Sequence, residues 1–357
     1  MEKIVFVLPD MPGGGTERVV ALLANEFCKR GIETAVLLFA GHETAYRLEE
    51  KVEVFCAGEP SKGNISSIMK RIWKMRQYYK KNRNCQIWSF CVMGSVFSVI
   101  AAWGQKHYFL VSERTDPSKC KEKGIRNFAY RFADVIVCQT KEAIEYFPRN
   151  IAKKSLVLPN PIDIGKNEPY DGEREKKVVA VGRLQYPKNH HLLLRAFALF
   201  AREYPDYTLD LYGKGKQEEE LRALAEELKI SSKVIFHGFS SQVKEEINVA
   251  AMYVLSSDYE GVSNSMLEAI ALGVPVIATD CPIGGCRMYI EDGVNGILVP
   301  VGEVEPLAAA MKKIASDKDF SAKLSREGRK LREQNHVAQI ADRFLETIKN
   351  SRGNETI

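Results

Sequence analysis

The chain has 357 residues, of which 45% are hydrophobic and 27% charged, and its formal net charge at pH 7 is +5. This length is enough for two domains of ~100–200 residues, and the composition is that of a soluble globular protein. No apolar run approaches the ~20 residues of a transmembrane helix, and the first eight residues predict a strand, not a signal peptide. The eight cysteines include no CxxC pair, so we expect reduced thiols and no metal or redox cluster.

The first half of the chain alternates between strand and helix patterns. Strands are predicted at 3–8, 34–39, 52–56, 86–90, 107–112, 134–138 and 155–158. Helices are predicted at 16–30, 64–82, 94–104, 124–132 and 141–147.

A glycine-rich turn, Gly13-Gly14-Gly15, joins the first strand to the first helix. Adjacent glycines let the backbone approach an anion closely, although a purely structural turn explains them equally well. The dinucleotide-binding fingerprint needs a third glycine where this chain has Arg18, so a nicotinamide enzyme is disfavoured.

Positive charge is concentrated between Pro60 and Ser112, which hold nine Lys or Arg residues and no Asp or Glu. Apolar residues recur there at helical spacing, which predicts a basic amphipathic helix over 64–83. Such a helix could dock on an anionic membrane surface or on an anionic acceptor. The alternative is the solvated face of a packed helix. No nucleic-acid partner is expected, because no recognised binding motif accompanies the patch.

The polar stretch 163–177 reads as a linker, after which the alternation resumes. Strands are predicted at 178–181, 208–212, 233–236, 252–255, 274–278 and 297–299. Helices are predicted at 189–203, 217–228, 242–249, 264–272 and 304–315, with an amphipathic helical tail at 320–350.

Strand–helix alternation that occurs twice predicts two doubly wound α/β domains. We place the first at 1–163 and the second at 164–335, and we expect the terminal helix 336–357 to pack back on the first. Ligands of such domains bind outside the carboxyl ends of the strands.

Two cations, Arg183 and Lys188, follow the first strand of the second domain. Together they could neutralise a diphosphate without a metal. Taken alone, the two residues are better explained as an ordinary surface Arg and Lys.

The segment from Tyr259 to Ala269 carries two carboxylates around a short helix that begins at Ser263 or Asn264. Amides at a helix start attract phosphate. Glu268, one turn into the helix, could accept two ribose hydroxyls, and Glu260, in the preceding loop, could reach a second polyol. The alternative is a capped surface helix with two solvated acids.

These segments stand in the order that is found in glycosyltransferase family 4, and the resemblance spans almost the whole chain. It rests on 14–17, 159–163, 182–184 with 188–189, 260–269, 280–285 and 292–300. The resemblance implies a GT-B fold, in which two Rossmann-like domains face a central cleft. It also implies metal-independent, retaining transfer from a nucleotide sugar, usually a UDP-sugar, with no cofactor.

Carried over to this chain, the resemblance gives roles to individual residues. Arg183 and Lys188 would hold the diphosphate, and Glu268 would bind the ribose. Glu260 and the segment of Ser263, Asn264, Ser265 and Met266 would face the donor sugar and the β-phosphate. Gly14 and Gly15 would contact the diphosphate or the sugar, and Asn160 belongs to the matching segment 159–163.

The chain departs from the family pattern in two places. Many relatives have a histidine after the strand at 107–112, where this chain has Glu113 and Arg114, as a subgroup of bacterial sugar transferases does. These two could contact donor or acceptor, or form part of an N-capped turn. The loop after Gly285 lacks an acid that relatives often carry, which puts a role for that loop in doubt.

The leading hypothesis is an enzyme that moves a hexose or N-acetylhexosamine to a lipid-linked or polysaccharide acceptor. It would serve capsule, O-antigen or exopolysaccharide synthesis as a peripheral protein at the cytoplasmic face of the membrane. The rivals are a UDP-GlcNAc 2-epimerase-like enzyme and a non-catalytic nucleotide-sugar-binding protein.

Overall fold

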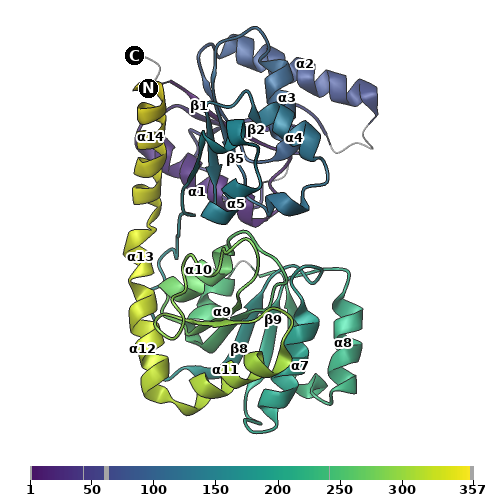
Figure 1. The fold of residues 1–357 in the computed structure, drawn as a ribbon, viewed down its shortest axis with the longest axis vertical. Coiled ribbons are helices and arrows are strands. Elements are labelled where there is room, and N and C mark those ends of the chain that lie inside the picture. The colour runs from purple at the N-terminus through teal and green to yellow at the C-terminus, as the bar shows by residue number, and fades with distance from the viewer. Residues whose placement is uncertain (1, 43, 60–63, 241, 354–357) are drawn as a thin grey trace. The chain divides into compact units, whose positions relative to one another are not determined.

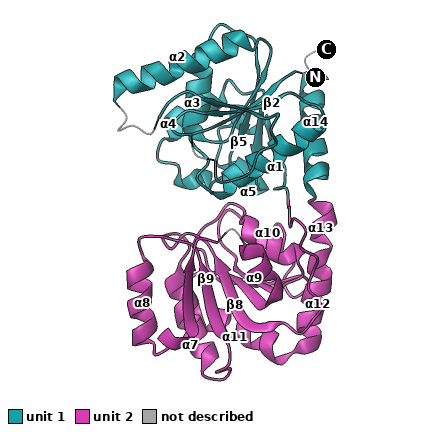
Figure 2. Cartoon of the chain, turned by 180° about the vertical axis from the view of Figure 1, so that it is seen from behind, with its two compact units in different colours: residues 1–161, 336–357 teal, residues 162–335 magenta. Residues whose placement is uncertain are grey.

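A computed structural model describes residues 2–42, 44–59, 64–240 and 242–353. The chain divides into two compact units. Unit 1 comprises residues 1–161 and 336–357, and unit 2 comprises residues 162–335 (Figure 2).

Unit 1 is built on a seven-stranded parallel sheet with the strand order β3-β2-β1-β4-β5-β6-β7. An inner strand, β1, reads IVFVL and all five of its residues are buried. A continuous apolar run of this kind is typical of a parallel strand that is covered on both faces. The strands are β1 (Ile4–Leu8), β2 (Thr34–Leu38), β3 (Glu53–Cys56), β4 (Gln86–Ser89), β5 (Tyr108–Ser112), β6 (Val135–Cys138) and β7 (Ser155–Val157).

Helices of unit 1 follow most of these strands and cover both faces of the sheet (Figure 1). They are α1 (Gly15–Lys29), α2 (Ile65–Lys81), α3 (Val92–Ala101), α4 (Lys123–Tyr130), α5 (Lys141–Glu145), α6 (Arg149–Ala152) and α14 (Val337–Gly353), with a 3₁₀ turn, η1 (Pro117–Lys119). The helix α2 packs against α3, and α3 packs against α4.

The C-terminal helix α14 is part of the core of unit 1. Phe344 of α14 stacks on Trp88 of β4 at 5.4 Å between ring centroids. Trp88 also meets Phe6 edge-on at 5.4 Å and Phe27 of α1 at 5.5 Å. Because aromatic rings bury large areas, this cluster ties residues from four elements into one core.

Unit 2 repeats the architecture with six parallel strands in the order β10-β9-β8-β11-β12-β13. The strands are β8 (Glu175–Val181), β9 (Thr208–Tyr212), β10 (Val234–Gly238), β11 (Ala250–Leu255), β12 (Val276–Thr279) and β13 (Ile297–Val299). The helices are α7 (His190–Ala201), α8 (Glu218–Glu227), α9 (Val243–Val249), α10 (Asn264–Ala271), α11 (Val304–Ser316), α12 (Lys318–Arg329) and α13 (Leu331–Gln334), with a 3₁₀ turn, η2 (Ser231–Lys233).

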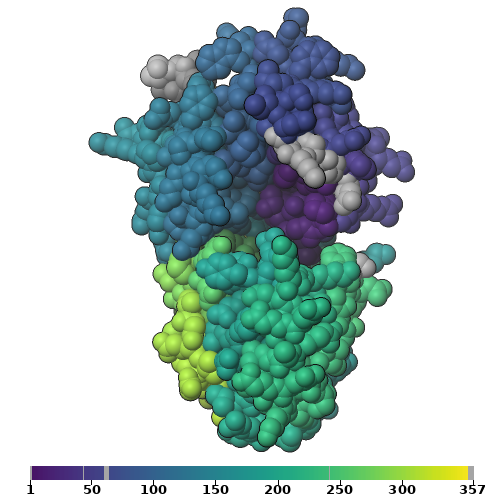
Figure 3. Space-filling view, turned by 90° about the vertical axis from the view of Figure 1, so that its right-hand side faces the viewer, coloured from purple at the N-terminus to yellow at the C-terminus, as the bar shows by residue number. Residues whose placement is uncertain are grey.

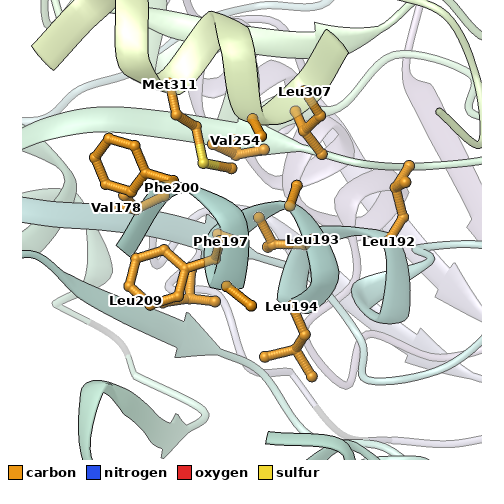
Figure 4. Close-up of a cluster of buried hydrophobic side chains, with 14 of the residues drawn as sticks. Val178, Leu192, Leu193, Leu194, Phe197, Phe200, Leu209, Val254, Leu307 and Met311 are labelled. Carbon is orange, nitrogen blue, oxygen red and sulfur yellow. The ribbon is translucent and has the colours of Figure 1, made fainter. Parts of the chain in front are cut away.

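Two apolar clusters hold the helices of unit 2 to its sheet. One joins α7 and α11 to β8, β9 and β11, with Phe197, Phe200 and Met311 fully buried (Figure 4). The other joins α9 and α10 to the same sheet through residues such as Tyr253, Met266 and Ile270. The loops at the carboxyl ends of β8 and β11 are therefore connected to well-packed elements.

The predicted α/β class, with two Rossmann-like parallel sheets, is confirmed. One detail of the predicted elements was wrong. The polar stretch 163–177 is not all linker, because β8 begins at Glu175. The tail at 320–350 is helical, as predicted, and consists of parts of three helices, α12, α13 and α14. Within the described ranges, no helix is long and apolar enough to cross a membrane.

Candidate active site

The candidate site of unit 2 is formed by two loops at neighbouring strand ends. Residues 182–189 follow β8, and residues 256–263 follow β11, which pairs in parallel with β8. Carboxyl ends of parallel strands meet at one edge of the sheet, where doubly wound folds bind their ligands. The sequence predicted this location.

Hydrogen bonds fasten the two loops to each other. Asn189 caps α7 by accepting from the Leu192 amide at 3.1 Å, and its side-chain amide donates to Asp258 at 2.6 Å. The Ser256 hydroxyl donates to the Lys188 carbonyl at 3.0 Å. These bonds fix the backbone of Lys188 on both sides, so its side chain starts from a defined position.

Lys188 forms an ion pair with Glu260, a carboxylate of the second loop. The two side chains are only 16% and 20% exposed. The aliphatic stem of Lys188 crosses Gly182, where an added Cβ would lie 3.1 Å from the lysine Cε. Partial burial reduces the solvent screening that weakens surface pairs. Lys188 is therefore not the ordinary solvated lysine that the sequence left as an alternative.

Arg183 lies in the same loop, directly after the end of β8, and it is exposed. Among the residues that the structure describes, its guanidinium has no hydrogen-bond or ion-pair partner. A guanidinium offers five N–H donors in a planar fork that matches phosphate oxygens. Arg183 thus has its full donor capacity available for an anionic ligand.

The start of α10 carries a chain of hydroxyl groups. Ser263 is the N-cap, and its hydroxyl accepts from the Met266 amide at 3.4 Å. The Ser265 hydroxyl lies 3.2 Å from that of Ser263 and 2.7 Å from that of Tyr253. Asn264 and Ser265 are partly exposed, whereas the Met266 side chain is fully buried. Only the backbone of Met266 could therefore face a ligand, and its N–H already has a partner.

Glu268 is 2% exposed, although it carries a carboxylate. The alternative in which both acids of this segment are solvated is therefore wrong for Glu268. Burial raises the pKa of the Tyr253 phenol, and the negative charges of Glu260 and Glu268 raise it further. Both carboxylates thus lie within electrostatic reach of one hydroxyl.

A third loop, which follows β12, packs against the backbone of the loop that carries Glu260. The Glu260 amide donates to the Pro282 carbonyl at 3.1 Å. A Cβ on Gly285 would lie only 1.5 Å from the Gly261 carbonyl oxygen, so glycine is required where the two loops touch. The sequence left the role of this loop in doubt, because the loop lacks the acid that relatives often carry. The contact between Gly285 and Gly261 involves the backbone, and no side-chain pattern in the sequence predicts it.

A buried histidine lies beside the loop that carries Arg183 and Lys188. His190 is the first residue of α7 and is 3% exposed. Burial, together with the positive charge of Lys188, lowers the pKa of His190 to about 4. His190 is therefore neutral at pH 7 and adds no charge to the site.

Unit 1 presents a different set of groups at the carboxyl edge of its own sheet. Gly14 is the N-cap of α1 and makes no side-chain capping bond. The Tyr46 hydroxyl donates to the carbonyls of Gly13 and Gly14, each at 3.0 Å. A Cβ on Gly14 would lie 2.3 Å from a carboxylate oxygen of Glu17, and Gly15 opens α1. The turn is thus closely packed as well as glycine-rich.

Glu113 and Arg114, which follow β5, are both buried. The Glu113 carboxylate accepts from the Tyr130 hydroxyl at 3.0 Å and from the Thr115 hydroxyl at 2.9 Å. The Arg114 guanidinium lies over the Phe90 ring at 5.6 Å. The expected capped turn also exists, but its cap is Asp116, which accepts from the Ser118 amide at 2.8 Å.

Asn160, which follows β7, is also buried and accepts a hydrogen bond from the Gln139 side chain at 3.0 Å. Gln139 itself comes directly after β6. Asn160 is thus a buried member of the polar edge of unit 1. In the described part of the chain, no group of three or more His, Cys, Asp or Glu side chains could hold a metal ion.

The sequence and the structure of the chain resemble those of known proteins. Residues 165–331, nearly all of unit 2, match the family model described as glycosyl transferases group 1. The chain has the GT-B fold. The structure of HepE from Anabaena in complex with UDP and glucose superposes with a TM-score of 0.86 at 21% identity, over 98% of this chain and 100% of that one.

Two curated relatives come from Campylobacter jejuni, and each covers most of the chain. One is a GalNAc-α-(1→4)-GalNAc-α-(1→3)-diNAcBac-PP-undecaprenol α-1,4-N-acetyl-D-galactosaminyltransferase, 26% identical over 98% of both chains. The other is an N-acetylgalactosamine-N,N′-diacetylbacillosaminyl-diphospho-undecaprenol 4-α-N-acetylgalactosaminyltransferase, 28% identical over 89% of this chain and 91% of that protein. These findings support a GT-B glycosyltransferase.

The family match covers the candidate residues of unit 2 but not those of unit 1. Arg183, Lys188, Glu260 and Glu268 all lie inside 165–331. The glycine turn, Glu113, Arg114 and Asn160 lie outside it.

Proposed function

We propose that this glycosyltransferase is a retaining, metal-independent enzyme of family 4. It would transfer a hexose or an N-acetylhexosamine from a UDP-sugar to a lipid-linked or polysaccharide acceptor. The observation that carries the proposal is the arrangement at the carboxyl edge of unit 2, where Lys188 lies in the same loop as the exposed Arg183 and pairs with Glu260 of the neighbouring loop.

The diphosphate of the donor is the proposed ligand of the two cations. Arg183 would bind phosphate oxygens through its fork of N–H groups, and Lys188 would add a compact second charge. As the sugar–phosphate bond breaks, negative charge grows on the leaving diphosphate. Fixed cations that stabilise this charge lower the barrier, and they do so without a metal ion.

Glu260 has two proposed roles, which its position in the structure supports. It holds the Lys188 ammonium in place before the donor arrives, so that little reorganisation is needed. Its second carboxylate oxygen could accept a hydroxyl hydrogen bond from the donor sugar. The start of α10, with Ser263, Asn264 and Ser265, would lie beside the β-phosphate.

Glu268 is the proposed acceptor of the ribose hydroxyls. A carboxylate in low-polarity surroundings gains most from charge-assisted hydrogen bonds, and a ribose supplies two donors. The 2% exposure of Glu268 makes this role sensitive to small changes in α10.

Retention of the anomeric configuration is proposed to follow from attack on the face that the diphosphate leaves. The acceptor hydroxyl would lose its proton to a leaving phosphate oxygen as the new glycosidic bond forms. The acceptor would be bound by unit 1, through Glu113, Arg114 and Asn160 or part of this set, whereas the proposed ligand of Gly14 and Gly15 is the diphosphate or the sugar of the donor.

The acceptor class rests on the printed names of the relatives, since both Campylobacter enzymes are named for undecaprenyl-linked glycans. A polyprenyl-diphosphate acceptor would place the enzyme at the cytoplasmic face of a membrane as a peripheral protein. The basic residues around α2 are suited to anionic lipid there.

A panel of UDP-sugars tests the proposal directly. We expect one of them to show saturation-transfer NMR signals with the protein and to yield a glycoside on an undecaprenyl-diphosphate-linked sugar. The anomeric signal of the product should match that of the donor. Inversion would contradict the mechanism, and an epimerised nucleotide sugar without glycoside would identify an epimerase instead. Binding with no turnover on a full acceptor panel would identify a non-catalytic binding protein.

A further inference from the structure

An exposed tyrosine lies at the tip of the loop that carries Arg183 and Lys188. Tyr186 is 61% exposed. The Lys188 amide donates to the Gln185 carbonyl at 2.9 Å, which closes a tight turn with Tyr186 at its second position. This loop belongs to the part of the chain that is coloured teal to green and that lies at the surface of unit 2 (Figure 3). A single exposed aromatic ring is ordinary on a protein surface, so the neighbours of the ring decide what it can do.

A second tyrosine, Tyr259 of the loop that follows β11, packs against the ring of Tyr186. The two ring centroids are 5.5 Å apart and the ring planes are inclined at 71°, which is the edge-to-face arrangement that aromatic rings prefer. Tyr259 is half-buried, whereas Tyr186 is mostly exposed. We call Tyr186 and Tyr259 the tyrosine pair.

Backbone hydrogen bonds hold the tyrosine pair in place. The Asp258 amide donates to the Pro187 carbonyl at 2.9 Å, and these two residues are the direct chain neighbours of Tyr259 and Tyr186. The bond from the Ser256 hydroxyl to the Lys188 carbonyl joins the same two loops at 3.0 Å. The exposed ring is therefore presented by a fixed turn, so that little side-chain and loop ordering is needed when a ligand binds.

Polar groups of the candidate site lie beside the tyrosine pair in the chain. Lys188 follows Tyr186 by two residues, and Glu260 directly follows Tyr259. Lys188 and Glu260 form the partly buried ion pair described above. The two loops thus combine an exposed aromatic ring with an ammonium donor and a carboxylate acceptor.

This combination matches the chemistry of a pyranose ring. Such a ring carries hydroxyl groups around its edge and C–H bonds on its faces. The C–H hydrogens are weakly positive, and they are attracted by the negative face of an aromatic ring. Binding sites for small polar molecules commonly pair aromatic side chains with a few placed donors and acceptors.

A nucleobase could also stack on an aromatic ring, but the order of the proposed ligands disfavours it here. The ribose is assigned to Glu268, and the start of α10 separates Glu268 from Tyr259 in the chain. The donor sugar is assigned to Glu260, which is the next residue after Tyr259. The tyrosine pair therefore adjoins the sugar end of the proposed site.

We propose that the tyrosine pair binds the C–H face of a pyranose ring, with Tyr186 as the stacking surface and Tyr259 as the residue that positions it. The pyranose would be the donor sugar or the sugar of the acceptor that receives it. This deepens the proposed function and rests on it, because Lys188 and Glu260 locate the reacting sugar. An axial hydroxyl interrupts a C–H face, so Tyr186 would also discriminate between epimeric sugars.

The variant Tyr186→Ala tests the proposal through three constants. Titration calorimetry measures the affinities for UDP and for the UDP-sugar that the panel identifies, and initial rates give the KM for the acceptor. UDP affinity should stay unchanged, while one of the other two constants weakens about tenfold, as for the loss of one aromatic contact. Weaker UDP-sugar binding would identify the donor sugar as the ligand, and a higher acceptor KM would identify the acceptor sugar.

Three further variants separate stacking from a purely structural role. Tyr186→Phe and Tyr186→Trp keep an aromatic face and should behave like the parent protein. Tyr170→Ala is the matched control, because it removes a partly exposed tyrosine that precedes the amino end of β8. Tyr186→Ala should also unfold in urea at the parent midpoint, since its side chain is mostly exposed.

Four results would overturn the proposal. Unchanged constants in Tyr186→Ala would show that no sugar contacts the ring. Equal weakening of UDP and UDP-sugar binding would show that the ring acts on the nucleotide or on the loop. A Tyr186→Phe variant as weak as Tyr186→Ala would assign the effect to the hydroxyl group. Failure of the parent protein to bind any UDP-sugar would overturn the proposed function and the tyrosine pair together, whereas the first three results leave the proposed function intact.

Discussion

The two units share a fold but differ in what they place at the carboxyl edge of the sheet. Unit 2 presents a cation pair, Arg183 and Lys188, with a carboxylate that orients one of them. Unit 1 presents a packed glycine turn and buried polar groups such as Glu113 and Asn160. The family match covers the edge of unit 2 and stops short of that of unit 1.

The proposed function assigns the departure of the diphosphate to the edge of unit 2 and the recognition of the acceptor to the edge of unit 1. A diphosphate leaving group needs the same fixed positive charge whatever sugar it carries, so the residues that supply it are constrained. An acceptor differs from enzyme to enzyme. The fold alone does not determine which acceptor is used, and we expect residues at the carboxyl edge of unit 1 to bind the acceptor selectively.

The largest effect should come from removing a cation of unit 2. Arg183→Ala or Lys188→Ala should lower the rate of sugar transfer about 100- to 1000-fold, because each loses a contact that strengthens as the diphosphate departs. Initial rates with labelled UDP-sugar measure this. Lys318→Ala, which removes an exposed lysine at the start of α12, is the control and should leave the rate unchanged. Near-normal rates in both site variants would contradict the diphosphate assignment.

The buried His190 should make stability depend on pH. Its folded-state pKa of about 4 lies below that of an unfolded chain, so only the unfolded state takes up a proton as the pH falls from ~6.5 towards 4. The contribution to stability is complete above pH ~6.5 and is lost on acidification, by roughly 3 kcal/mol at its full extent. His190→Gln should remove this part of the pH dependence.

Urea unfolding at a series of pH values measures the difference between parent and variant. Other groups contribute equally to both proteins, so the difference isolates His190. If the free energies of unfolding of the two proteins change in parallel between pH 4 and 6.5, His190 takes up its proton in the folded protein as well, which would contradict the prediction.

A smaller and more selective effect is expected in unit 1. Glu113→Gln keeps the size of the side chain but weakens its hydrogen bonds with Tyr130 and Thr115. We expect transfer to an acceptor to fall about tenfold, as for the loss of one charge-assisted hydrogen bond, while UDP binding stays unchanged. A parallel loss of UDP affinity would contradict the proposal that unit 2 binds the donor and unit 1 binds the acceptor.

The smallest expected effect is that of metal removal. Treatment with EDTA should leave the transfer rate unchanged, because Arg183 and Lys188 are proposed to supply the positive charge. Full loss of activity that one divalent ion restores would contradict a metal-independent mechanism.

Sequence reasoning found the elements because each carries a local signal. The strand–helix alternation and the apolar runs located β1 and α10, and the polar N-cap residues placed the start of α10 within one residue. The positions of Arg183 and Lys188 followed from the rule that loops at carboxyl strand ends carry ligands.

Long-range contacts and burial were the parts that local patterns could not reveal. The pairing of Lys188 with Glu260 joins residues that are 72 positions apart. The burial of Glu268 and His190 depends on which helix face meets the sheet and on loops that fold over the helix start. The contact between Gly285 and Gly261 involves backbone alone, so no side-chain pattern signals it.

The most direct test of the account is the equilibrium affinity of the protein for UDP, measured by titration calorimetry on the parent protein and on variants of unit 2. The parent protein and Lys318→Ala should bind with the same affinity, while Arg183→Ala with Lys188→Ala should lose at least 100-fold. Unchanged UDP affinity in that double variant would contradict the central claim that these two cations hold the diphosphate.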